Sequence, residues 1–342
     1  MNSPKRILWS ANDPGGMNAI APVIRALIAR GDEVVGITTG PAVAIAAQNG
    51  IAVQDASACP EEVLRGKVEA ARSQVFLAGS SVGDSIDKKI FRLIPQVPSV
   101  YVLDFWSNYR MRFSAGEEDL GYLPTAICVI DELARREMLA AGFDGRRLHV
   151  TGNPHTEHFT EGITHDRENA DEIVFISQPV REVDGEKYGF DEYLVLEHLA
   201  RAVQKMPEPF YLHIRLHPKD EPHKFDGHLG GRISMFTASS LEESLSTAGL
   251  VVGMFSPVLI QAAAAGKQVL SYEPGLKGED PLATNRLGLT KKLATETELE
   301  DALRAYAAGE PPPATLDVSV LWPKGAAERI VRVIDSLVSP RE

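Results

Sequence analysis

Basic side chains gather directly after one apolar run in the second half of the sequence, where they could bind an anion. Within residues 214–219, Arg215, His217 and Lys219 alternate with other residue types, and Pro218 follows the histidine. Three potential cations this close together suit a phosphate group, and a histidine N–H can donate to a phosphate oxygen from the neutral or the charged ring. A solvated surface turn is the alternative, although basic clusters are uncommon on an acidic protein.

A second candidate anion site lies at residues 253–261, where an apolar run leads into a helical pattern. Ser256 is a favoured N-cap residue, and Pro257 is favoured at the first helical position. The same geometry aims a hydroxyl and free N–H groups at a ligand. An ordinary capped helix explains Ser256 and Pro257 equally well, but it does not explain the polar Gln261 among apolar residues. We therefore predict that Phe255, Ser256, Pro257 and Gln261 contact a phosphate-bearing donor.

A glycine pair follows the first apolar run of the chain and precedes a helical pattern. Gly15 and Gly16 lie within residues 12–18, directly after residues 6–11. Adjacent glycines let a backbone approach a ligand closely, and the helix that follows offers free N–H groups and a partial positive charge. Asp13 in the same loop could act as a general base. The alternative is a tight turn that needs glycine and that Asp13 caps.

Aromatic and polar side chains are interleaved in residues 104–110. Asp104, Trp106, Asn108 and Tyr109 suit stacking on a sugar ring and hydrogen bonding to its hydroxyls. A wall between two domains has the same composition, and both interpretations stay open. Other strand-ending loops supply the remaining predicted site residues, namely Asn12, Asn153 and His155 for an acceptor or cleft, and Ser177 and Gln178 for a donor.

Several well-known motifs are absent, which narrows the chemistry. The sequence has no G-x-G-x-x-G after a strand, no G-x-x-x-x-G-K-[ST], no H-E-x-x-H and no paired C-x-x-C. Dinucleotide, P-loop and common zinc sites therefore lose their main support. Because no isolated D-x-D follows an apolar strand, we expect no metal and no cofactor. Phosphate recognition would then come from helix N-termini and from neutral or cationic side chains.

The chain has 342 residues, enough for two domains that each bury a core. Hydrophobic residues make up 44% and charged residues 24%, as in globular rather than disordered proteins. Lys and Arg number 35 against 47 Asp and Glu, and this net charge of −12 argues against a nucleic-acid partner. Two cysteines, Cys59 and Cys128, favour a reduced, cytoplasmic location, and we expect neither a signal peptide nor a membrane span.

Apolar runs of strand length alternate with helical patterns, so the expected fold class is α/β with parallel sheets covered on both faces. Strands are predicted at residues 6–11, 33–39, 75–79, 99–104, 126–131, 173–177, 211–216, 233–236, 250–255 and 268–272. Asn18 is expected to cap the first helix, with Pro22 in or just after its first turn. Further helices are predicted at residues 41–49, 191–205, 241–248, 257–265, 297–308 and 324–338.

The elements form two similar series that divide the chain. Residues 154–171 are polar and almost without periodicity, and are the best linker candidate, while residues 311–313 form a second, rigid break. We predict an N-terminal acceptor domain at 1–155, a linker at 156–171, a C-terminal donor domain at 172–322 and a trailing helix at 323–342. In open parallel sheets ligands bind beyond the carboxyl ends of the strands, where the candidate loops fall.

Taken together, these loops resemble those of glycosyltransferases of the GT-B fold. In that fold two Rossmann-like domains face each other across a cleft, and a C-terminal helix crosses back to the N-terminal domain. Residues 261–267 look like the donor-binding helix of the fold, whose family pattern has Glu where this chain has Gln261. That Glu holds the nucleotide ribose in the family, and an amide can also bond a hydroxyl.

The pair His217-Pro218, followed by Ser256 at a helix start, is similar to the HP and serine motifs of bacterial sialyl-, polysialyl- and Kdo-transferases. Those enzymes use CMP-activated acidic sugars, and CDP-glycerol transferases share the pattern. The resemblance implies that His217 and Ser256 bind the donor phosphate and that an N-terminal carboxylate, matched to Asp13, is the base. The second serine of the family motif is replaced by Pro257.

The resemblance implies a metal-independent glycosyltransferase that moves a sugar from a nucleotide-activated donor to a surface glycan, a glycolipid or a protein. A CMP-activated nonulosonic acid or Kdo donor is favoured, with a UDP-sugar as the other option. A glycolipid acceptor would imply peripheral membrane association. The sequence predicts no particular oligomeric state.

Two other functional classes stay open. Residues 152–154 resemble a segment of UDP-sugar 2-epimerases, which share the fold, although their N-terminal Arg-Pro-Glu signature is absent here. A nucleotide-sugar epimerase or hydrolase would turn over its substrate without an acceptor. A non-catalytic sugar-nucleotide binding protein would bind the ligand and show no turnover.

Overall fold

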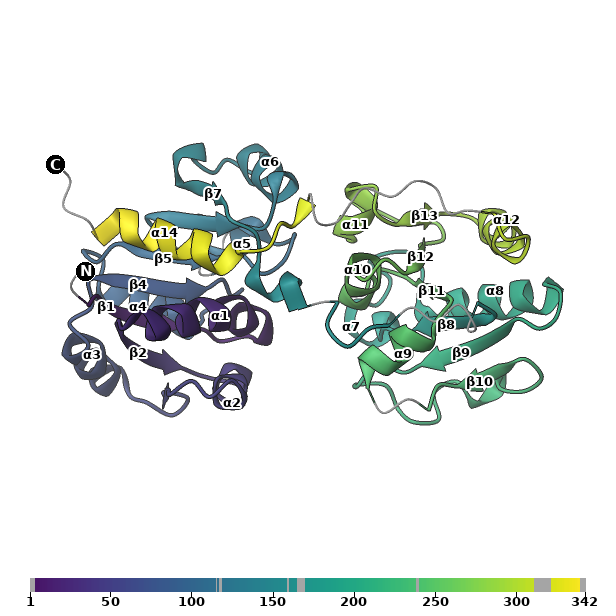
Figure 1. Ribbon diagram of the computed structural model, residues 1–342, viewed down its shortest axis with the longest axis horizontal. Coiled ribbons are helices and arrows are strands. Elements are labelled where there is room, and N and C mark those ends of the chain that lie inside the picture. Colours follow the sequence, from purple (N-terminus) through teal and green to yellow (C-terminus); the bar gives the residue numbers. More distant parts are fainter. Residues whose placement is uncertain are drawn as a thin grey trace. The chain divides into compact units, whose positions relative to one another are not determined.

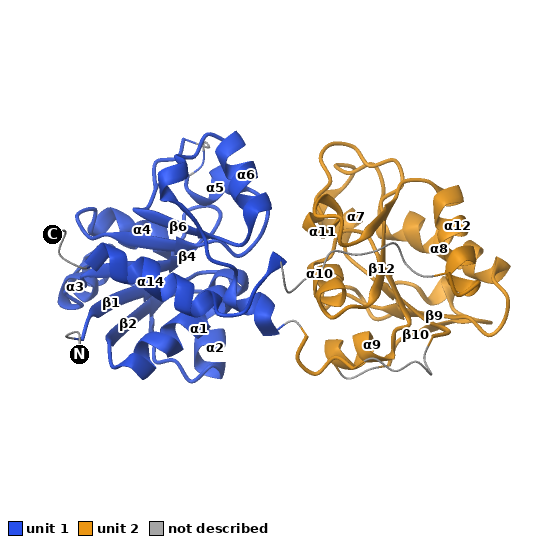
Figure 2. Cartoon of the chain, turned by 45° about the horizontal axis from the view of Figure 1, so that its top comes forward, with its two compact units in different colours: residues 1–158, 319–342 blue, residues 159–318 orange. Residues whose placement is uncertain are grey.

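The protein, described by a computed structural model, consists of two compact units. Unit 1 comprises Met1–His158 and Ser319–Glu342, and unit 2 comprises Phe159–Val318 (Figure 2). The structure describes residues 4–114, 116, 119–158, 160–164, 170–237, 240–310 and 321–338. Part of the predicted linker (residues 159 and 165–169) and the break at residues 311–313 lie outside the described residues. Within them, no helix is both long and apolar enough to cross a bilayer.

Unit 1 is built on a parallel sheet whose strands lie in the order β3-β2-β1-β4-β5-β6-β7 (Figure 1). The strands are β1 (Arg6–Ser10), β2 (Glu33–Thr38), β3 (Gln54–Asp55), β4 (Val75–Gly79), β5 (Ser99–Val102), β6 (Ala126–Val129) and β7 (Leu148–Val150). The helices are α1 (Pro14–Arg30), α2 (Pro41–Gln48), α3 (Glu61–Ala70), α4 (Ile86–Leu93), α5 (Tyr109–Arg112), α6 (Glu132–Ala140) and α14 (Ala326–Val338), with short 3₁₀ turns at Gly145–Arg147 and Pro154–His158.

Unit 2 repeats this plan with a parallel sheet in the order β10-β9-β8-β11-β12-β13. The strands are β8 (Glu172–Ile176), β9 (Tyr211–Arg215), β10 (Ile233–Met235), β11 (Leu250–Gly253), β12 (Gln268–Tyr272) and β13 (Lys291–Leu293). The helices are α7 (Val180–Asp184), α8 (Glu192–Lys205), α9 (Leu241–Thr247), α10 (Pro257–Ala264), α11 (Ala283–Arg286) and α12 (Glu296–Ala307), with a 3₁₀ turn at Asp226–His228.

Each sheet has a switch point. There, successive strands stop being added on one side of the first strand and begin to be added on its other side. In unit 1 it lies between β1 and β4, and in unit 2 between β8 and β11. The loops that leave these neighbouring strands diverge to opposite faces, so the crevice at the carboxyl edge is the usual ligand position in this kind of sheet. The central strands β1, β4, β5, β6, β8, β11 and β12 are almost entirely buried, as their apolar sequences predict, whereas the edge strands β3 and β13 are mostly exposed.

The C-terminal helix returns to unit 1, as the sequence predicts. α14 lies beside α1 and buries Ile330 and Ile334 in the core of that unit (Figure 1). Asp335 on the same helix pairs with Lys5 at 2.5 Å and with Arg30 at 2.8 Å. Apolar burial and these ion pairs together fasten the end of the chain to the first sheet.

The first helix begins earlier than the sequence pattern suggests. α1 starts at Pro14 with Asp13 at the N-cap position, so the prediction that Asn18 caps it is wrong and Pro22 lies inside the helix. The proline at position 14 explains the early start, because a first helical residue needs no N–H partner. As a result Gly15 and Gly16 lie in the first turn of a helix and not in a free loop.

Several strands end one or two residues before their predicted ends. β5 stops at Val102, so Asp104 belongs to the loop at the carboxyl edge, and β11 stops at Gly253, so Phe255 does too. The apolar pattern continues past the last ladder hydrogen bond because these edge residues still pack on the core. The helices α3, α4 and α6 are not among the predicted elements, because the prediction for the first half of the chain rests on its strands and on the loops that follow them.

Candidate functional site

His217 lies two residues after the end of β9 and is half-buried. The backbone N–H of Lys219 donates to His217 Nδ1 at 3.1 Å. A neutral ring whose Nδ1 accepts a hydrogen bond carries its proton on Nε2. Burial lowers the pKa of His217, and the charges of Lys219 and Lys224 lower it further against the opposing effect of a nearby carboxylate. At neutral pH His217 is therefore an uncharged N–H donor of fixed tautomer.

Asp220 holds the loop that carries His217. Its Oδ2 accepts the Ser177 hydroxyl at 2.7 Å and the backbone N–H of His217 at 2.9 Å. Its Oδ1 pairs with Lys224 at 2.8 Å, and its side chain is fully buried. Burial opposes ionisation of Asp220, yet these three partners lower its pKa overall. The carboxylate therefore joins the ends of β8 and β9, a role that the sequence reading missed.

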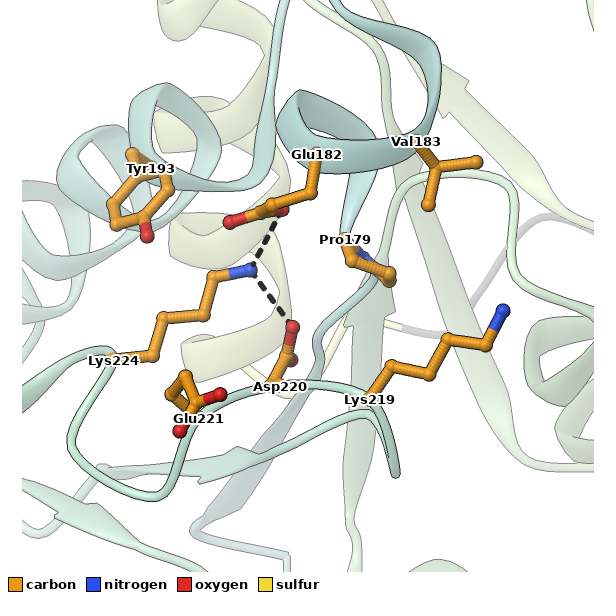
Figure 3. A pocket seen from close by; sticks show the side chains of 8 residues that line it. All are labelled: Pro179, Glu182, Val183, Tyr193, Lys219, Asp220, Glu221 and Lys224. Carbon is orange, nitrogen blue, oxygen red and sulfur yellow. Dashed lines mark hydrogen bonds and ion pairs between the residues drawn. The ribbon is translucent and has the colours of Figure 1, made fainter.

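Lys224 lies at the centre of a carboxylate cluster beside this loop. Its ammonium contacts Glu192 at 2.5 Å and Glu182 at 3.2 Å as well as Asp220, and the pairing with Asp220 and Glu192 raises its pKa against the effect of burial. Figure 3 shows the ammonium between Glu182 and Asp220, while the Lys219 side chain extends away from it. A pocket of about 270 Å³ opens here, lined by Pro179, Glu182, Val183, Tyr193, Lys219, Asp220, Glu221 and Lys224.

The N-terminus of α10 follows β11 at the switch point of unit 2. Ser256 is the N-cap residue, its hydroxyl oxygen accepts the N–H of Val258 at 3.2 Å, and Pro257 occupies the first helical position, as predicted. The Gln178 side-chain oxygen accepts the N–H of Phe255 at 3.0 Å. The loops after β8 and β11 are thus joined, as those after β8 and β9 are. Gln261 lies one turn further along α10 and is half-buried.

Arg215 does not join the predicted cluster of cations. Its guanidinium donates to the carbonyl of Ser240 at 3.0 Å and to the hydroxyl of Ser244, so it anchors α9. Burial lowers its pKa, which fits a charge held inside the unit. Pro218 and Lys219 are exposed. The cationic character of this edge therefore rests on Lys219, with His217 and the Ser256 hydroxyl as uncharged donors.

In unit 1, Asp13 lies at the carboxyl end of β1 and is half-buried. Its carboxylate makes no cap hydrogen bond to α1, and Oδ1 accepts the side-chain N–H of Asn12 at 2.9 Å. The Asn12 oxygen accepts the hydroxyl of Thr39 at 2.8 Å, which fixes the amide. Asp13 is thus oriented by a neutral partner and keeps acceptor capacity for a ligand.

Asp104 lies at the same edge, after β5, and is paired. Its Oδ1 accepts Arg112 at 2.5 Å and the Ser80 hydroxyl at 3.3 Å. Arg112 also donates to the carbonyl of Ser80 at 2.7 Å and to that of Ser107 at 2.9 Å. Its side chain is 8% exposed, so this guanidinium is used within the protein.

Other protein atoms lie against the glycine pair, at the position where the sequence predicts a ligand. A Cβ at Gly15 would lie 2.0 Å from Asp104 Oδ2, and one at Gly16 would lie 3.2 Å from the Cα of Gly79. Gly16 is buried against Gly79, and its predicted contact with a donor stays a prediction. The glycines instead allow α1 to approach β4 and the Asp104 carboxylate to lie against the first turn of α1.

Two aromatic residues predicted for the acceptor region are structural. Trp106 is 3% exposed, and its indole N–H donates to Asp131 Oδ2 at 2.9 Å. Trp322 donates to the same oxygen at 3.0 Å, with the two indoles 5.5 Å apart. The Tyr109 hydroxyl donates to Glu137 at 2.6 Å. The polar atoms of Trp106 and Tyr109 thus have partners within unit 1, and their contact with an acceptor stays a prediction.

The remaining predicted residues of unit 1 divide into exposed and buried ones. Asn108 is exposed in a left-handed conformation with φ of 55° at the start of α5. Asn153 is buried and donates to the carbonyl of Asp104 at 3.3 Å, while its oxygen accepts the N–H of His155 at 2.9 Å. His155 is half-buried, and burial lowers its pKa. The loops after β5 and β7 are therefore joined by an amide.

Each unit also buries a carboxyl group that the sequence reading passed over. Asp87 in α4 is fully buried, burial raises its pKa to about 7, and neither oxygen has a hydrogen bond of normal geometry within the described residues. Glu273, after β12, is fully buried too, and burial together with the charge of Asp280 raises its pKa to about 7 despite Lys292 at 3.4 Å. Their signal in sequence is weak, because single acidic residues near strand and helix ends are common.

The described part of the chain gathers no group of three or more His, Cys, Asp or Glu side chains suited to a metal ion. It brings together Ser177, Gln178, His217, Phe255 and Ser256 in unit 2, and Asn12, Asp13, Asp104 and Asn153 in unit 1. Arg215, Trp106 and Tyr109 point to structural partners instead.

No family model matches this chain, and no curated protein sequence is significantly similar to it. Solved structures are similar over almost the whole chain. A Listeria monocytogenes protein described as a UDP-N-acetylglucosamine 2-epimerase is 18% identical with a TM-score of 0.66, covering 99% of this chain and 98% of that one.

Two further solved structures are similar to the chain over almost its whole length. The UDP-GlcNAc 2-epimerase of Methanocaldococcus jannaschii is 13% identical with a TM-score of 0.67, covering 96% of this chain and 99% of that one. The glycotransferase of kitacinnamycin is 16% identical with a TM-score of 0.66, covering 99% and 100%. At these identities the likeness concerns the fold, and it confirms the predicted two-domain α/β architecture of the GT-B type.

Proposed function

We propose that the chain is a glycosyltransferase that moves a sugar from a nucleotide-activated donor to a hydroxyl group of a glycan, glycolipid or protein. The observation that supports this most directly is the donor set at the switch-point edge of unit 2. There the Lys219 N–H fixes His217 as an Nε2–H donor, and Ser256 caps α10. Such a set suits the phosphate of a leaving nucleotide, whose negative charge grows as the glycosidic bond breaks.

The mechanism assigns the leaving group to unit 2. His217 Nε2–H and the Ser256 hydroxyl donate to the phosphate oxygens, and the positive end of α10 stabilises their charge, since the N–H groups of Val258 and Leu259 are already bonded to Ser256. Each such donor aimed at developing charge contributes about 3 to 4 kcal/mol in well-studied enzymes. We propose that this donor set acts without a divalent metal, so turnover should persist in EDTA. Turnover that is lost in EDTA and restored by Mn²⁺ or Mg²⁺ would contradict that part of the proposal.

Proton removal from the acceptor is assigned to Asp13 in unit 1. Its carboxylate has only a neutral amide as partner in the described contacts, whereas Asp104 is already engaged by Arg112 and Ser80. A base must accept the hydroxyl proton as the oxygen attacks the anomeric carbon, so the less engaged carboxylate is the better candidate. Asp104 and then His155 would be the next candidates.

The nucleotide is the least constrained part of the proposal. The HP and serine motifs favour CMP, as in the transferases that the sequence resembles. Solved structures of the same fold favour UDP, since an epimerase of M. jannaschii was solved with UDP-GlcNAc and UDP and an Anabaena protein with UDP and glucose. We test both by thermal shift with CMP, CDP, UDP and GDP. A ligand at a hundred times its Kd stabilises a protein by about 2.7 kcal/mol, so one nucleotide should raise Tm clearly above the others.

A second candidate function is a nucleotide-sugar 2-epimerase or hydrolase. The solved epimerases of similar fold favour it, while the missing Arg-Pro-Glu signature speaks against it. The two activities separate in one assay, in which the nucleotide sugar identified by thermal shift is incubated with and without acceptors. Turnover that needs an acceptor supports the transferase. Turnover without one supports the epimerase or hydrolase, and binding without any turnover supports a sugar-nucleotide binding protein.

A further inference from the structure

The carboxyl edge of unit 1 carries carboxylate, amide and hydroxyl groups. Asp13 and Asn12 follow β1, Asp104 follows β5, and Asn153 lies in the loop after β7. Phe105, next to Asp104, is half-buried and offers part of an aromatic ring. Carboxylates and amides bond sugar hydroxyls, and an aromatic face packs on the apolar face of a sugar ring.

Basic side chains near this edge already have protein partners. Arg112 is held by Asp104 and by two backbone carbonyls. Lys88 is fully buried, and its ammonium donates to the carbonyls of Gly83, Met111 and Ser114 at 2.6, 3.2 and 2.7 Å. Arg329 donates to the carbonyls of Thr151, Lys324 and Pro323. These three cations are therefore not presented to an anionic ligand.

The N-terminus of α1, the natural place for an anion at this edge, has a carboxylate of the protein beside it. Asp104 Oδ2 lies where a Gly15 side chain would begin, 2.0 Å from the ideal Cβ position. The positive end of the helix thus already stabilises a negative charge. A ligand phosphate placed there would meet this carboxylate.

Buried polar groups behind the edge supply no positive charge. The hydroxyl oxygens of Ser10, at the end of β1, and Ser81, shortly after β4, are buried and lack hydrogen-bond partners within the described residues. Both oxygens of Asp87 lack normal hydrogen bonds as well, and this group and Asp13 lie close enough to repel each other when charged. These side chains are 0% exposed and out of reach of a ligand, and because none of them is a cation they do not favour an anion at this edge.

We infer that unit 1 binds an uncharged, hydroxyl-bearing acceptor, such as a neutral sugar residue, and disfavours acceptors with a phosphate, sulfate or carboxylate next to the reacting hydroxyl. The inference rests on the proposed function for the statement that this ligand is the acceptor. The edge of unit 2 has the opposite character, because Lys219, His217 and the start of α10 all favour an anion there.

The test compares matched neutral and anionic saccharides. Binding of methyl β-galactoside and methyl β-glucoside to the full chain is measured by saturation-transfer NMR and calorimetry, against their 6-phosphates, 6-sulfates and uronic acids, with the best-binding nucleotide present. We expect each anionic member to bind at least about 10-fold more weakly than its neutral counterpart, the scale of one poorly screened charge contact. Equal or tighter binding of the anionic members, or no binding of either class, would overturn the inference.

Two variants separate charge from shape. Asp104→Asn keeps the size of the side chain and frees the charge of Arg112, so the preference for neutral saccharides should shrink or reverse. Asp13→Asn, at a half-buried position with one side-chain hydrogen bond, should reduce the preference for neutral over anionic saccharides without affecting folding. An unchanged preference in both folded variants would contradict the electrostatic argument. If the wild-type chain binds no nucleotide but still prefers neutral saccharides, the proposed function fails while this inference stands.

Discussion

The two units share one topology but carry different chemical groups at their carboxyl edges. In each, the strand that opens the series lies at the switch point, and the loop after it helps form the carboxyl edge. At the edge of unit 2 the groups that face outward are an N–H of His217, a capped helix start and an exposed lysine. At the edge of unit 1 they are carboxylates and amides, with an internal carboxylate beside the helix start.

The two units differ in the helix start considered at each switch point, which is α1 after β1 in unit 1 and α10 after β11 in unit 2. In unit 1, Gly15 lets Asp104 approach α1, so the helix start is matched by the protein itself. In unit 2, Ser256 caps α10 and Pro257 is its first residue, so no carboxylate of the protein occupies the cap position and the Ser256 hydroxyl can donate to a ligand. Each unit thus has a helix start at its switch point, and a few loop residues decide which chemical groups stand beside it.

The largest expected effect comes from the base in unit 1. Asp13→Asn should lower kcat by about 10²- to 10⁴-fold, the usual contribution of a general base, because the amide cannot take the acceptor proton. Steady-state turnover with donor and acceptor measures it. Asp144→Asn, which only breaks an exposed pair with Arg146, is the matched control and should keep wild-type turnover. Full turnover by Asp13→Asn would move the base to Asp104 or His155.

Replacing Gly15 tests the close approach of the Asp104 carboxylate to α1, which distinguishes unit 1. Gly15→Ala forces the Asp104 carboxylate away from α1 and should destabilise the fold by about 1 to 3 kcal/mol, as overpacking does. Gly66→Ala, in α3 with open space around the new methyl group, should stabilise it by about 0.5 to 1 kcal/mol. Urea unfolding of both variants measures the difference. A stable Gly15→Ala protein would show that Asp104 yields easily.

Buried carboxyl groups give both units a stability that falls as pH rises. The pKa of Asp87 and that of Glu273 are raised by burial to about 7, so the folded state keeps protons that the unfolded state has already lost. Each group's contribution is complete below pH 4 and is lost as pH passes through 7. Between pH 6 and 8 the loss is about 1.4 kcal/mol for each group.

Isosteric variants assign this loss to a unit. Asp87→Asn and Glu273→Gln should each flatten the fall of unfolding free energy between pH 6 and 8, measured by urea titration at both pH values. Glu33→Gln, which removes an exposed carboxylate of β2, should leave the slope as in the wild type. An unaltered slope in Asp87→Asn would mean that this carboxyl group is ionised in the folded protein at pH 6.

The smallest expected effect comes from the positioning of the His217 loop. Asp220→Asn retains an acceptor for Ser177 or the His217 N–H but removes the charge that pairs with Lys224. Nucleotide affinity should fall by about 2- to 10-fold, the value of one neutral hydrogen bond. Asp226→Asn, whose partner His223 is exposed, is the control and should bind as the wild type does. A loss as large as that of His217→Ala would make Asp220 a direct ligand contact.

The alternation of strands and helices and the capped start of α10 could be read from sequence, because apolar periodicity and the Ser-Pro pair are local signals. The pairing of Asp104 with Arg112 and the burial of Trp106 could not. A segment with aromatic and polar residues fits both a binding surface and a wall, and only the tertiary partners, Asp131 and Trp322 here, decide between them. The same applies to Arg215, whose partners in α9 lie 25 and 29 residues away.

The early start of α1 shows a different limit of prediction from sequence. Two glycines after a strand suggested a ligand loop, yet Pro14 already begins the helix and the glycines serve packing against Asp104 and Gly79. Asp220 was missed because its importance comes from joining two strands that are adjacent only in the folded sheet. Local rules find elements and caps, whereas contacts across strands require the structure.

We assign the donor phosphate to the edge of unit 2 and the base to the edge of unit 1. This assignment is tested most directly by measuring the nucleotide affinity of two variants side by side. Calorimetry with CMP and UDP is performed on the wild type, His217→Ala and Asp13→Asn, with His223→Ala as an exposed histidine control from the same loop. A hydrogen bond to a charged group contributes about 1.5 to 3 kcal/mol, so His217→Ala should bind the preferred nucleotide about 10- to 150-fold more weakly. Asp13→Asn and His223→Ala should bind it within about twofold of the wild type, a difference below 0.5 kcal/mol. Wild-type affinity in His217→Ala, or an equal loss in Asp13→Asn, would contradict the assignment of the phosphate to unit 2.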